Sequence, residues 1–220
     1  MFRKLIEKIK ELNRTTPPFD PSSLEDPIAA RTQWTPLVRG GANFCTHRLL
    51  EVTPHRIEFR ASLGAKLFCL IFILVGLGVL VGFSYRIISK GNFEFGLDTI
   101  GPIVFGLLFA GVGGAMLYFL TKPSVFDKTN GYFWKGRRSP DQVFNKDLIK
   151  HLAPLDQVHA LQLVSEYCSG NKSSYYSYEL NLVLKDGRRV NVIDHGNINR
   201  IRQDAQTLSN FLGKPVWNAL

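Results

Sequence analysis

Two long apolar stretches, residues 67–83 and 100–120, constrain this chain more than any other feature. Neither stretch contains a charged residue. At ~1.5 Å of rise per residue, helices of these lengths extend roughly 26 and 31 Å, against about 30 Å for the hydrocarbon core of a bilayer. A short connector, residues 84–99, separates the two stretches. The sequence therefore predicts a transmembrane helical hairpin over residues 62–122.

The basic residues are distributed unevenly around these stretches. Eight Lys or Arg residues flank the hairpin on the side of the termini, and two lie in the connector, where Glu94 and Asp98 offset them. The flanking residues are Arg56, Arg60, Lys66, Lys122, Lys128, Lys135, Arg137 and Arg138, and the connector residues are Arg86 and Lys90. Because cytoplasmic segments carry an excess of Lys and Arg, the bias predicts that both termini are cytoplasmic. The net charge of +9 is otherwise dispersed, which argues against a nucleic-acid partner.

The segment before the first apolar stretch divides into two parts. Residues 1–14 carry apolar side chains at helical spacing among basic ones, which predicts an amphipathic helix. Such a helix either lies on the lipid surface or packs against its own domain or a partner. Residues 15–41 contain five prolines and little apolar periodicity, so they are expected to form a linker.

Strand patterns occupy the rest of the chain. Residues 42–61 predict a first β-hairpin, and residues 123–220 predict the remainder of the same domain. Asp186-Gly187 joins two alternating segments, as in a tight hairpin turn. A helix is expected over residues 198–212, where an apolar stripe ends at Gly213, a typical C-cap residue. The expected fold is a membrane α-helical hairpin plus an α+β cytosolic domain of about seven antiparallel strands closed by a C-terminal helix.

This element order resembles pleckstrin-homology-like domains. The whole chain is similar to bacterial proteins in which a cytosolic domain of that type is attached to a two-helix membrane hairpin. The resemblance covers residues 42–61 and 123–217, and it departs from a simple domain because the membrane hairpin interrupts it after the second strand. It implies a multi-pass protein of the inner (cytoplasmic) membrane, and binding or scaffolding rather than catalysis.

Small residues recur within the two predicted spans. Gly78 and Gly82 are four residues apart, and Gly106, Ala110 and Gly114 repeat the same spacing. Small residues at this spacing let helix backbones approach closely in lipid. They serve either the packing of the two spans on each other or a homo-oligomer interface. Neither span contains a charged residue, which argues against a transporter or channel.

Motifs for catalysis or cofactor binding are weak throughout the chain. Cys45 and His47 would share a strand face, but a zinc site needs about four ligands. Asp194 and His195 are adjacent on a predicted strand, so their side chains are expected to face opposite sides, with Asp194 serving a turn. We therefore expect no catalytic residue, no metal and no cofactor.

Two surfaces are candidates for binding. The basic residues Lys122, Lys128, Lys135, Arg137 and Arg138 follow the second span, where they either hold the domain against anionic lipid or only enforce the topology. The aromatic residues Trp34, Tyr175, Tyr176 and Tyr178 are either anchors for a partner or packing at the edge of the core.

These patterns leave three functional hypotheses. The first is a non-enzymatic scaffold or regulator that binds a protein partner at the cytosolic face of the membrane. The second is a membrane immunity protein that neutralises a toxin. The third is a membrane-tethered enzyme of unknown reaction.

Overall fold

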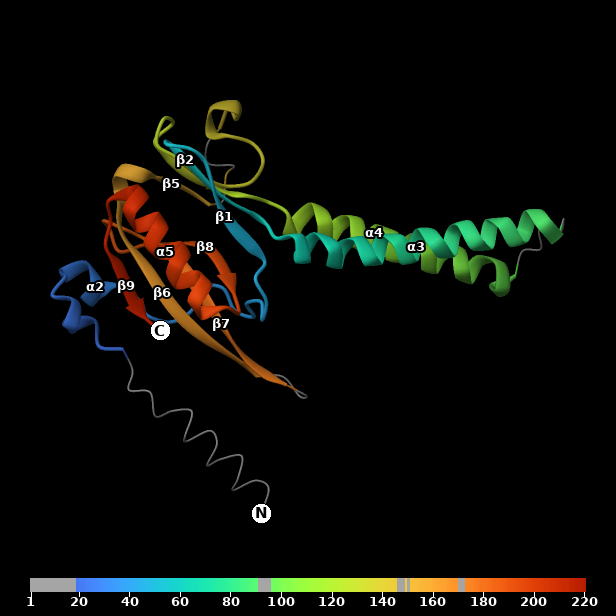
Figure 1. Ribbon diagram of the computed structural model, residues 1–220, viewed down its shortest axis with the longest axis horizontal. Coiled ribbons are helices and arrows are strands. Elements are labelled where there is room, and N and C mark those ends of the chain that lie inside the picture. Colours follow the sequence, from blue (N-terminus) through green and yellow to red (C-terminus); the bar gives the residue numbers. More distant parts are fainter. Residues whose placement is uncertain (1–18, 91–95, 146–148, 150, 170–172) are drawn as a thin grey trace, which may run out of the picture.

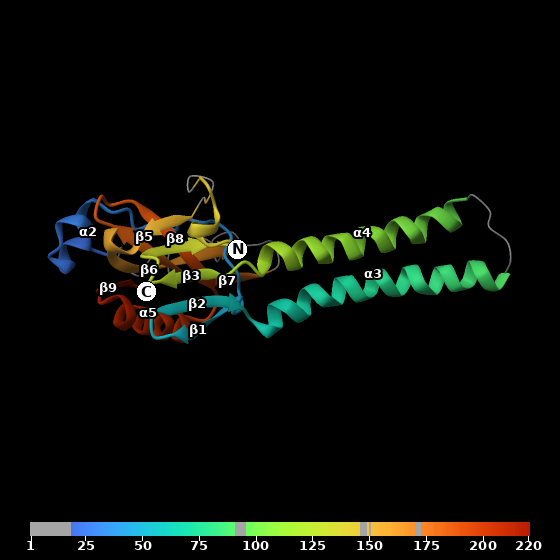
Figure 2. The same cartoon turned by 90° about the horizontal axis from the view of Figure 1, so that it is seen from above.

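A pair of long helices projects from one end of a β-rich domain (Figures 1 and 2). The computed structural model describes residues 19–90, 96–145, 149, 151–169 and 173–220. The amphipathic helix expected at residues 1–14 lies outside the described residues. The helices are α3, Leu63–Lys90, and α4, Leu97–Leu120, which run side by side.

Both helices are long and apolar enough to cross a membrane. They extend beyond the predicted spans, because α3 includes Arg86 and α4 begins beside Asp98. Only 11% of the apolar window in each helix is buried within the protein. An apolar surface of this size calls for an apolar environment around it, as the predicted membrane hairpin requires.

The hairpin is inserted between two neighbouring strands of a five-stranded antiparallel sheet, sheet A. Its strands, in spatial order, are β1 (His47–Thr53), β2 (Arg56–Ala61), β3 (Ser124–Asp127), β4 (Tyr132–Lys135) and β5 (Leu152–Pro154). β2 leads into α3, and α4 leads into β3. Because β2 pairs with β3, the two helices connect to adjacent strands of sheet A.

A second sheet, sheet B, has the order β8-β7-β6-β9. Its strands are β6 (Val158–Ser169), β7 (Ser174–Leu184), β8 (Arg189–His195) and β9 (Val216–Ala219). β9 pairs with β6 in parallel, and all the other pairings are antiparallel. The expected mostly antiparallel domain is confirmed, but the count of about seven strands is too low, because the described residues form five strands in sheet A and four in sheet B. The short strands β5 and β9 were missed because three or four residues show no clear alternation.

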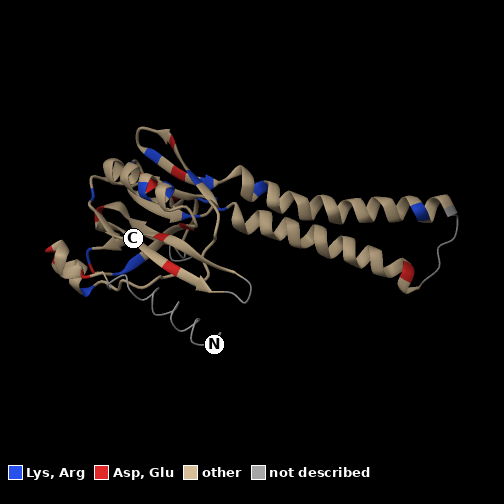
Figure 3. Cartoon of the chain, turned by 60° about the horizontal axis from the view of Figure 1, so that its bottom comes forward, with Lys and Arg blue, Asp and Glu red and all other residues tan. Residues whose placement is uncertain are grey.

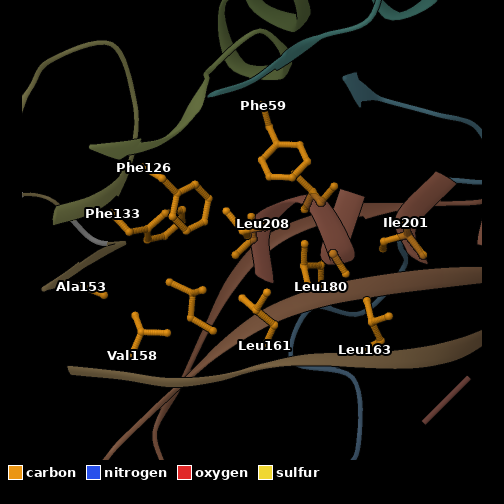
Figure 4. Packing of buried hydrophobic residues seen from close by; sticks show 14 of the residues in the cluster. Phe59, Phe126, Phe133, Ala153, Val158, Leu161, Leu163, Leu180, Ile201 and Leu208 are labelled. Carbon is orange, nitrogen blue, oxygen red and sulfur yellow. The ribbon is translucent and has the colours of Figure 1, made fainter. Parts of the chain in front are cut away.

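The predicted C-terminal helix is confirmed as α5, Ile198–Leu212. Asn197 caps its first turn by accepting a hydrogen bond from Arg200 N, and Gly213 ends it with a φ of 66°. The core lies between α5 and the inner faces of both sheets (Figure 4). Sheet A contributes Phe59, Phe126 and Phe133, sheet B contributes Leu161 and Leu180, and α5 contributes Ile201 and Leu208.

The segment expected to be a linker contains structure from residue 19 onward. It forms two short helices, η1 (Pro21–Leu24) and α2 (Pro27–Arg31), each capped by a preceding aspartate. Trp34 packs on Trp217 of β9 with ring centroids 5.9 Å apart, and Ala29 is fully buried. The segment thus covers the outer face of sheet B, the face opposite α5. Two further single turns are η2 (Pro140–Gln142) and η4 (Leu155–Gln157).

Candidate functional site

A cavity of about 1140 Å³ lies where the membrane hairpin joins the domain. Its walls come from the loop before β1, the first turns of α3, the end of α4, the loop after β4 and the last residues of β8. Figure 3 shows Lys and Arg residues near the point at which the helices leave the domain.

The charged side chains that line this cavity are mostly basic. Four of the five basic residues predicted as a lipid-facing group line it: Lys122, Lys135, Arg137 and Arg138. His47 and His151 also contribute, and Asp194 is the one acidic side chain among the described lining residues. Lys128 is not part of the site, because its Nζ lies 4.4 Å from the ring centroid of Phe211 on α5.

Lys135 ends β4 and is the innermost cation of the cavity. Its Nζ donates a hydrogen bond to Asn191 Oδ1 at 2.5 Å. Burial lowers the pKa of the Lys135 ammonium, and the carboxylates of Asp194 and Glu179 partly offset this effect. Asn191 in turn donates from Nδ2 to Glu179 Oε1 at 2.8 Å and to Asp194 Oδ1 at 2.9 Å. The Asn191 amide therefore orients the Lys135 ammonium, and the carboxylates of Glu179 and Asp194 in turn bind that amide.

Glu179 is the buried carboxylate that fixes the loop at the cavity's edge. Only 2% of the residue is exposed, and it accepts hydrogen bonds from the backbone N–H groups of Leu37 and Val38 at 2.7 and 2.9 Å. Glu166 accepts hydrogen bonds from the backbone N–H groups of Gly40 and Gly41. Glu179 was not predicted as a site residue, because in the sequence it alternates with Tyr178 and Leu180 and so falls on the more polar face of the strand. Val183 on that same face was the available hint that the face is covered.

The wall on the membrane side is apolar and aromatic. Phe68 of α3 and Tyr118 and Phe119 of α4 line it, and each is about half exposed. Lys122 Nζ lies 4.8 Å from the ring centroid of Phe119, and the Arg137 guanidinium lies 4.7 Å from that of Tyr118. Arg137 also donates hydrogen bonds to Tyr118 O at 3.1 Å and Thr121 Oγ1 at 2.7 Å. It therefore satisfies backbone oxygen at the end of α4.

The aromatic residues predicted as a partner surface do not form one group. Trp34 packs on Trp217 and donates from Nε1 to Ala29 O at 3.0 Å, on the covered outer face of sheet B. Tyr175 donates from its hydroxyl to Gly41 O at 3.0 Å, and Tyr178 packs against the core. Tyr176 is exposed and lies 5.2 Å from Tyr167, ring centroid to ring centroid. Only Tyr176 among the four has the exposure of a surface anchor.

The small residues of the spans divide between two faces. A Cβ atom on Gly106 would lie 2.6 Å from Leu80 Cγ, and a Cβ on Gly76 would lie 2.6 Å from Gly106 O and still closer to Ala110 N. Gly106 and Ala110 therefore belong to the packing of α4 on α3, together with Gly76, which the sequence analysis did not single out. Three others, Gly78, Gly82 and Gly114, have no atom within 4 Å of a Cβ position and face away from the partner helix.

Asp194 and His195 face opposite sides of β8, as adjacent strand residues do. Asp194 lines the cavity and bonds to the Asn191 side chain, while His195 is fully buried against α5. His195 Nε2 lies 4.0 Å from Asp204 Oδ2, and Asn197 N donates to His195 Nδ1. Among the described residues, no three His, Cys, Asp or Glu side chains gather as metal ligands would.

Comparison of this chain with protein-family models, with curated proteins and with solved structures found no match. Functional arguments for this protein therefore depend on its own geometry.

Proposed function

We propose that this protein is a non-enzymatic scaffold or regulator of the bacterial inner membrane, which binds a protein partner through its cytosolic domain. The main observation in support of this proposal is the direct connection between sheet A and the two helices. β2 ends at Ala61 and α3 begins at Leu63, while α4 ends at Leu120 and β3 begins at Ser124. These connections are too short to act as flexible linkers. The domain is thereby held at a fixed height and orientation relative to the hairpin.

The side chains at the connections reinforce this fixed geometry. Ser62 Oγ accepts a hydrogen bond from Ala65 N at 3.1 Å, which caps the start of α3. Arg137 binds the end of α4, and His47 Nε2 lies 3.3 Å from Lys122 O. A domain with a fixed orientation presents the same surface to other proteins at the membrane. That property suits a scaffold or regulator better than an enzyme that must reach diffusing substrates.

A preorganised apolar loop beside the junction supports a protein partner. Leu37, Val38 and Phe44 are between 41% and 45% exposed. The backbone between them is fixed by the carboxylates of Glu179 and Glu166. Binding to such a loop costs little conformational entropy, because its backbone is already ordered. The resemblance to pleckstrin-homology-like domains and the excess of basic residues flanking the spans agree with a cytosolic binding domain.

The test is affinity purification of the full chain in lipid nanodiscs, with quantitative mass spectrometry of the proteins that accompany it. We expect one partner in near-equal amount, and its loss from a Leu37→Ser/Val38→Ser variant. A matched control is Leu50→Ser/Val52→Ser on β1, where the two side chains are 44% and 43% exposed. A preparation without any stoichiometric partner would overturn the proposal. Equal loss of the partner from both variants would overturn the choice of surface.

A further inference from the structure

The cavity at the membrane junction has two chemically different walls. The wall that faces the domain carries Lys135, Arg138 and the polar end of β8. The wall that faces the hairpin carries Phe68 and Phe119, which also belong to the exposed apolar surface of α3 and α4. An occupant that satisfies both walls has a charged end and an apolar end. A membrane lipid has this construction, and the apolar wall is continuous with the helices that a bilayer would surround.

The basic side chains of the cavity favour an occupant that carries negative charge. Among the described residues, no carboxylate lies within the 4.0 Å of an ion pair from the terminal nitrogens of Lys122, Lys135, Arg137 or Arg138. The one lining carboxylate, that of Asp194, accepts from Asn191. Several cations that converge on one cavity, with no direct ion pair to a described carboxylate, favour an anion there. Phosphate oxygens accept hydrogen bonds from both Lys and Arg.

The level of the cavity along the molecule matches that of lipid headgroups. Lys66, near the start of α3, and Lys122, just after α4, mark the ends of the apolar helices. Tyr118 lies beside Lys122 and Arg137, a combination that is typical of the membrane interface. Basic pockets next to transmembrane helices on the cytoplasmic side are suited to anionic headgroups.

We propose that the junction cavity binds the phosphate-bearing headgroup of an anionic membrane lipid, with Lys135 as the inner ligand and Arg138 and Lys122 at the rim. The acyl chains would lie along Phe68 and Phe119. The lipid would then fill the space between the domain and the hairpin and contact both. This ligand would bind whether or not a protein partner exists, so it goes beyond the function proposed above.

The experiment uses the full chain in non-ionic detergent after removal of bound lipid. It is titrated with short-chain phosphatidylglycerol, with short-chain phosphatidylcholine and with inorganic phosphate, and bound ligand is counted by native mass spectrometry. We expect one phosphatidylglycerol per chain to bind at least about tenfold more tightly than the other two probes, because a charge-assisted hydrogen bond contributes on the order of one factor of ten.

Two variants locate the site. Lys135→Gln removes the inner cation and is expected to weaken phosphatidylglycerol binding about tenfold. Arg138→Gln changes an exposed rim residue, so it keeps the test valid if Lys135→Gln folds poorly. The matched control is Lys185→Gln, an exposed cation next to the Asp186-Gly187 turn that does not line the cavity and should leave binding unchanged.

Each outcome decides the proposal. Selective binding of phosphatidylglycerol that is lost in the cavity variants and kept in the control supports it. Equal binding of inorganic phosphate would replace the lipid with a soluble phosphate as the ligand, which overturns the lipid assignment. Equal binding of phosphatidylcholine, or no effect of either cavity variant, would overturn recognition of an anion by this cavity. None of these results depends on recovery of a protein partner.

Discussion

In the membrane hairpin, α3 and α4 meet backbone to backbone at glycines, whereas the outer face of sheet B is covered through hydrogen bonds to buried polar side chains. Gly76 and Gly106 allow the first contact because neither has a side chain to separate the helices. Glu179 and Gln162 make hydrogen bonds of the second kind, and both residues are buried. Gln162 donates to Gln33 O at 3.0 Å, in the segment that covers the sheet.

The difference follows from the environment of each region. Between helices in lipid there is no hydrophobic driving force, so close packing of small residues provides the attraction. In the domain, a segment with little regular structure leaves many backbone N–H groups without partners, and these must be satisfied once the segment is buried. The carboxylates of Glu179 and Glu166 satisfy four of them.

The largest effect is expected from Glu179→Ala. It leaves the N–H groups of Leu37 and Val38 and the buried amide of Asn181 without their carboxylate acceptor, so we expect the free energy of unfolding to fall by about 3 kcal/mol or more. All three tryptophans belong to the domain, so urea unfolding of the full chain in nanodiscs, followed by tryptophan fluorescence, measures it.

Glu166→Ala is the control for this prediction, since Glu166 binds Gly40 and Gly41 from a partly exposed position. We expect a loss of about 1 kcal/mol. Small and equal losses in the two variants would show that apolar contacts, and not the buried carboxylate, hold the segment on the sheet.

The second effect concerns the hairpin. Gly76→Leu forces α3 away from α4 and should cost about 1–3 kcal/mol of helix packing. The measurement is cross-linking of a Phe72→Cys/Phe109→Cys pair in a chain without its natural cysteines, since these rings stack with centroids 5.7 Å apart. Cross-linking should fall, with tryptophan-detected unfolding of the domain unchanged.

Gly78→Leu is the matched control, because a Cβ atom at this position would have no neighbour within 4 Å. Cross-linking within the hairpin should be retained. If Gly78→Leu instead disrupts a dimer in the same nanodiscs, the outward small residues form a contact between two copies of the chain.

A third prediction uses pH to separate the two regions. Burial opposes the ionisation of Glu58, but hydrogen bonds from Arg60 and Arg56 outweigh it, and the pKa of Glu58 is lowered from its ordinary value of 4.5. A lowered pKa stabilises the folded domain above pH 4.5, and that contribution is lost as pH falls through the folded-state value. Acid should therefore change tryptophan fluorescence before it changes the circular dichroism of the hairpin helices, whose apolar spans carry no charge.

Glu58→Gln tests the cause of this acid response. The variant should be less stable than the natural chain at neutral pH and should lose less of its stability on acidification. An unchanged acid transition in Glu58→Gln would assign the effect to other carboxylates.

The smallest effect is expected at the connection between the regions. Arg137→Gln removes hydrogen bonds to Tyr118 O and Thr121 Oγ1, but Arg137 is exposed, so water replaces them. We expect a loss below about 1 kcal/mol in the urea unfolding measurement. A larger loss would show that the hairpin and the domain stabilise each other and do not behave as separate regions.

Elements with a strong local pattern were predicted well. The two apolar helices and α5 were recognised, because a long uncharged run or an amphipathic stripe is visible without knowledge of the fold. Four cavity residues, Lys122, Lys135, Arg137 and Arg138, were also identified as a group by their distance from the second span. Their convergence on one cavity, together with the exclusion of Lys128, required the pairing of β3 with β4 and the position of α5.

The elements that were missed depend on distant partners. β9 is a strand because residues 216–219 pair with β6, far away in the sequence. Residues 21–41 are ordered because sheet B offers them Trp217 and buried acceptors. Glu179 is buried because that segment covers it.

The sequence by itself determined where the chain is apolar enough to enter a membrane, which end of the hairpin is basic, and where the last helix lies. These features depend on hydropathy, charge and spacing along the chain, which do not require knowledge of contacts. The tertiary structure alone decided the two-sheet arrangement, the covered face of sheet B, the division of glycines between inner and outer helix faces, and the basic cavity. Each of these depends on which distant residues become neighbours, and short segments of sequence do not specify that.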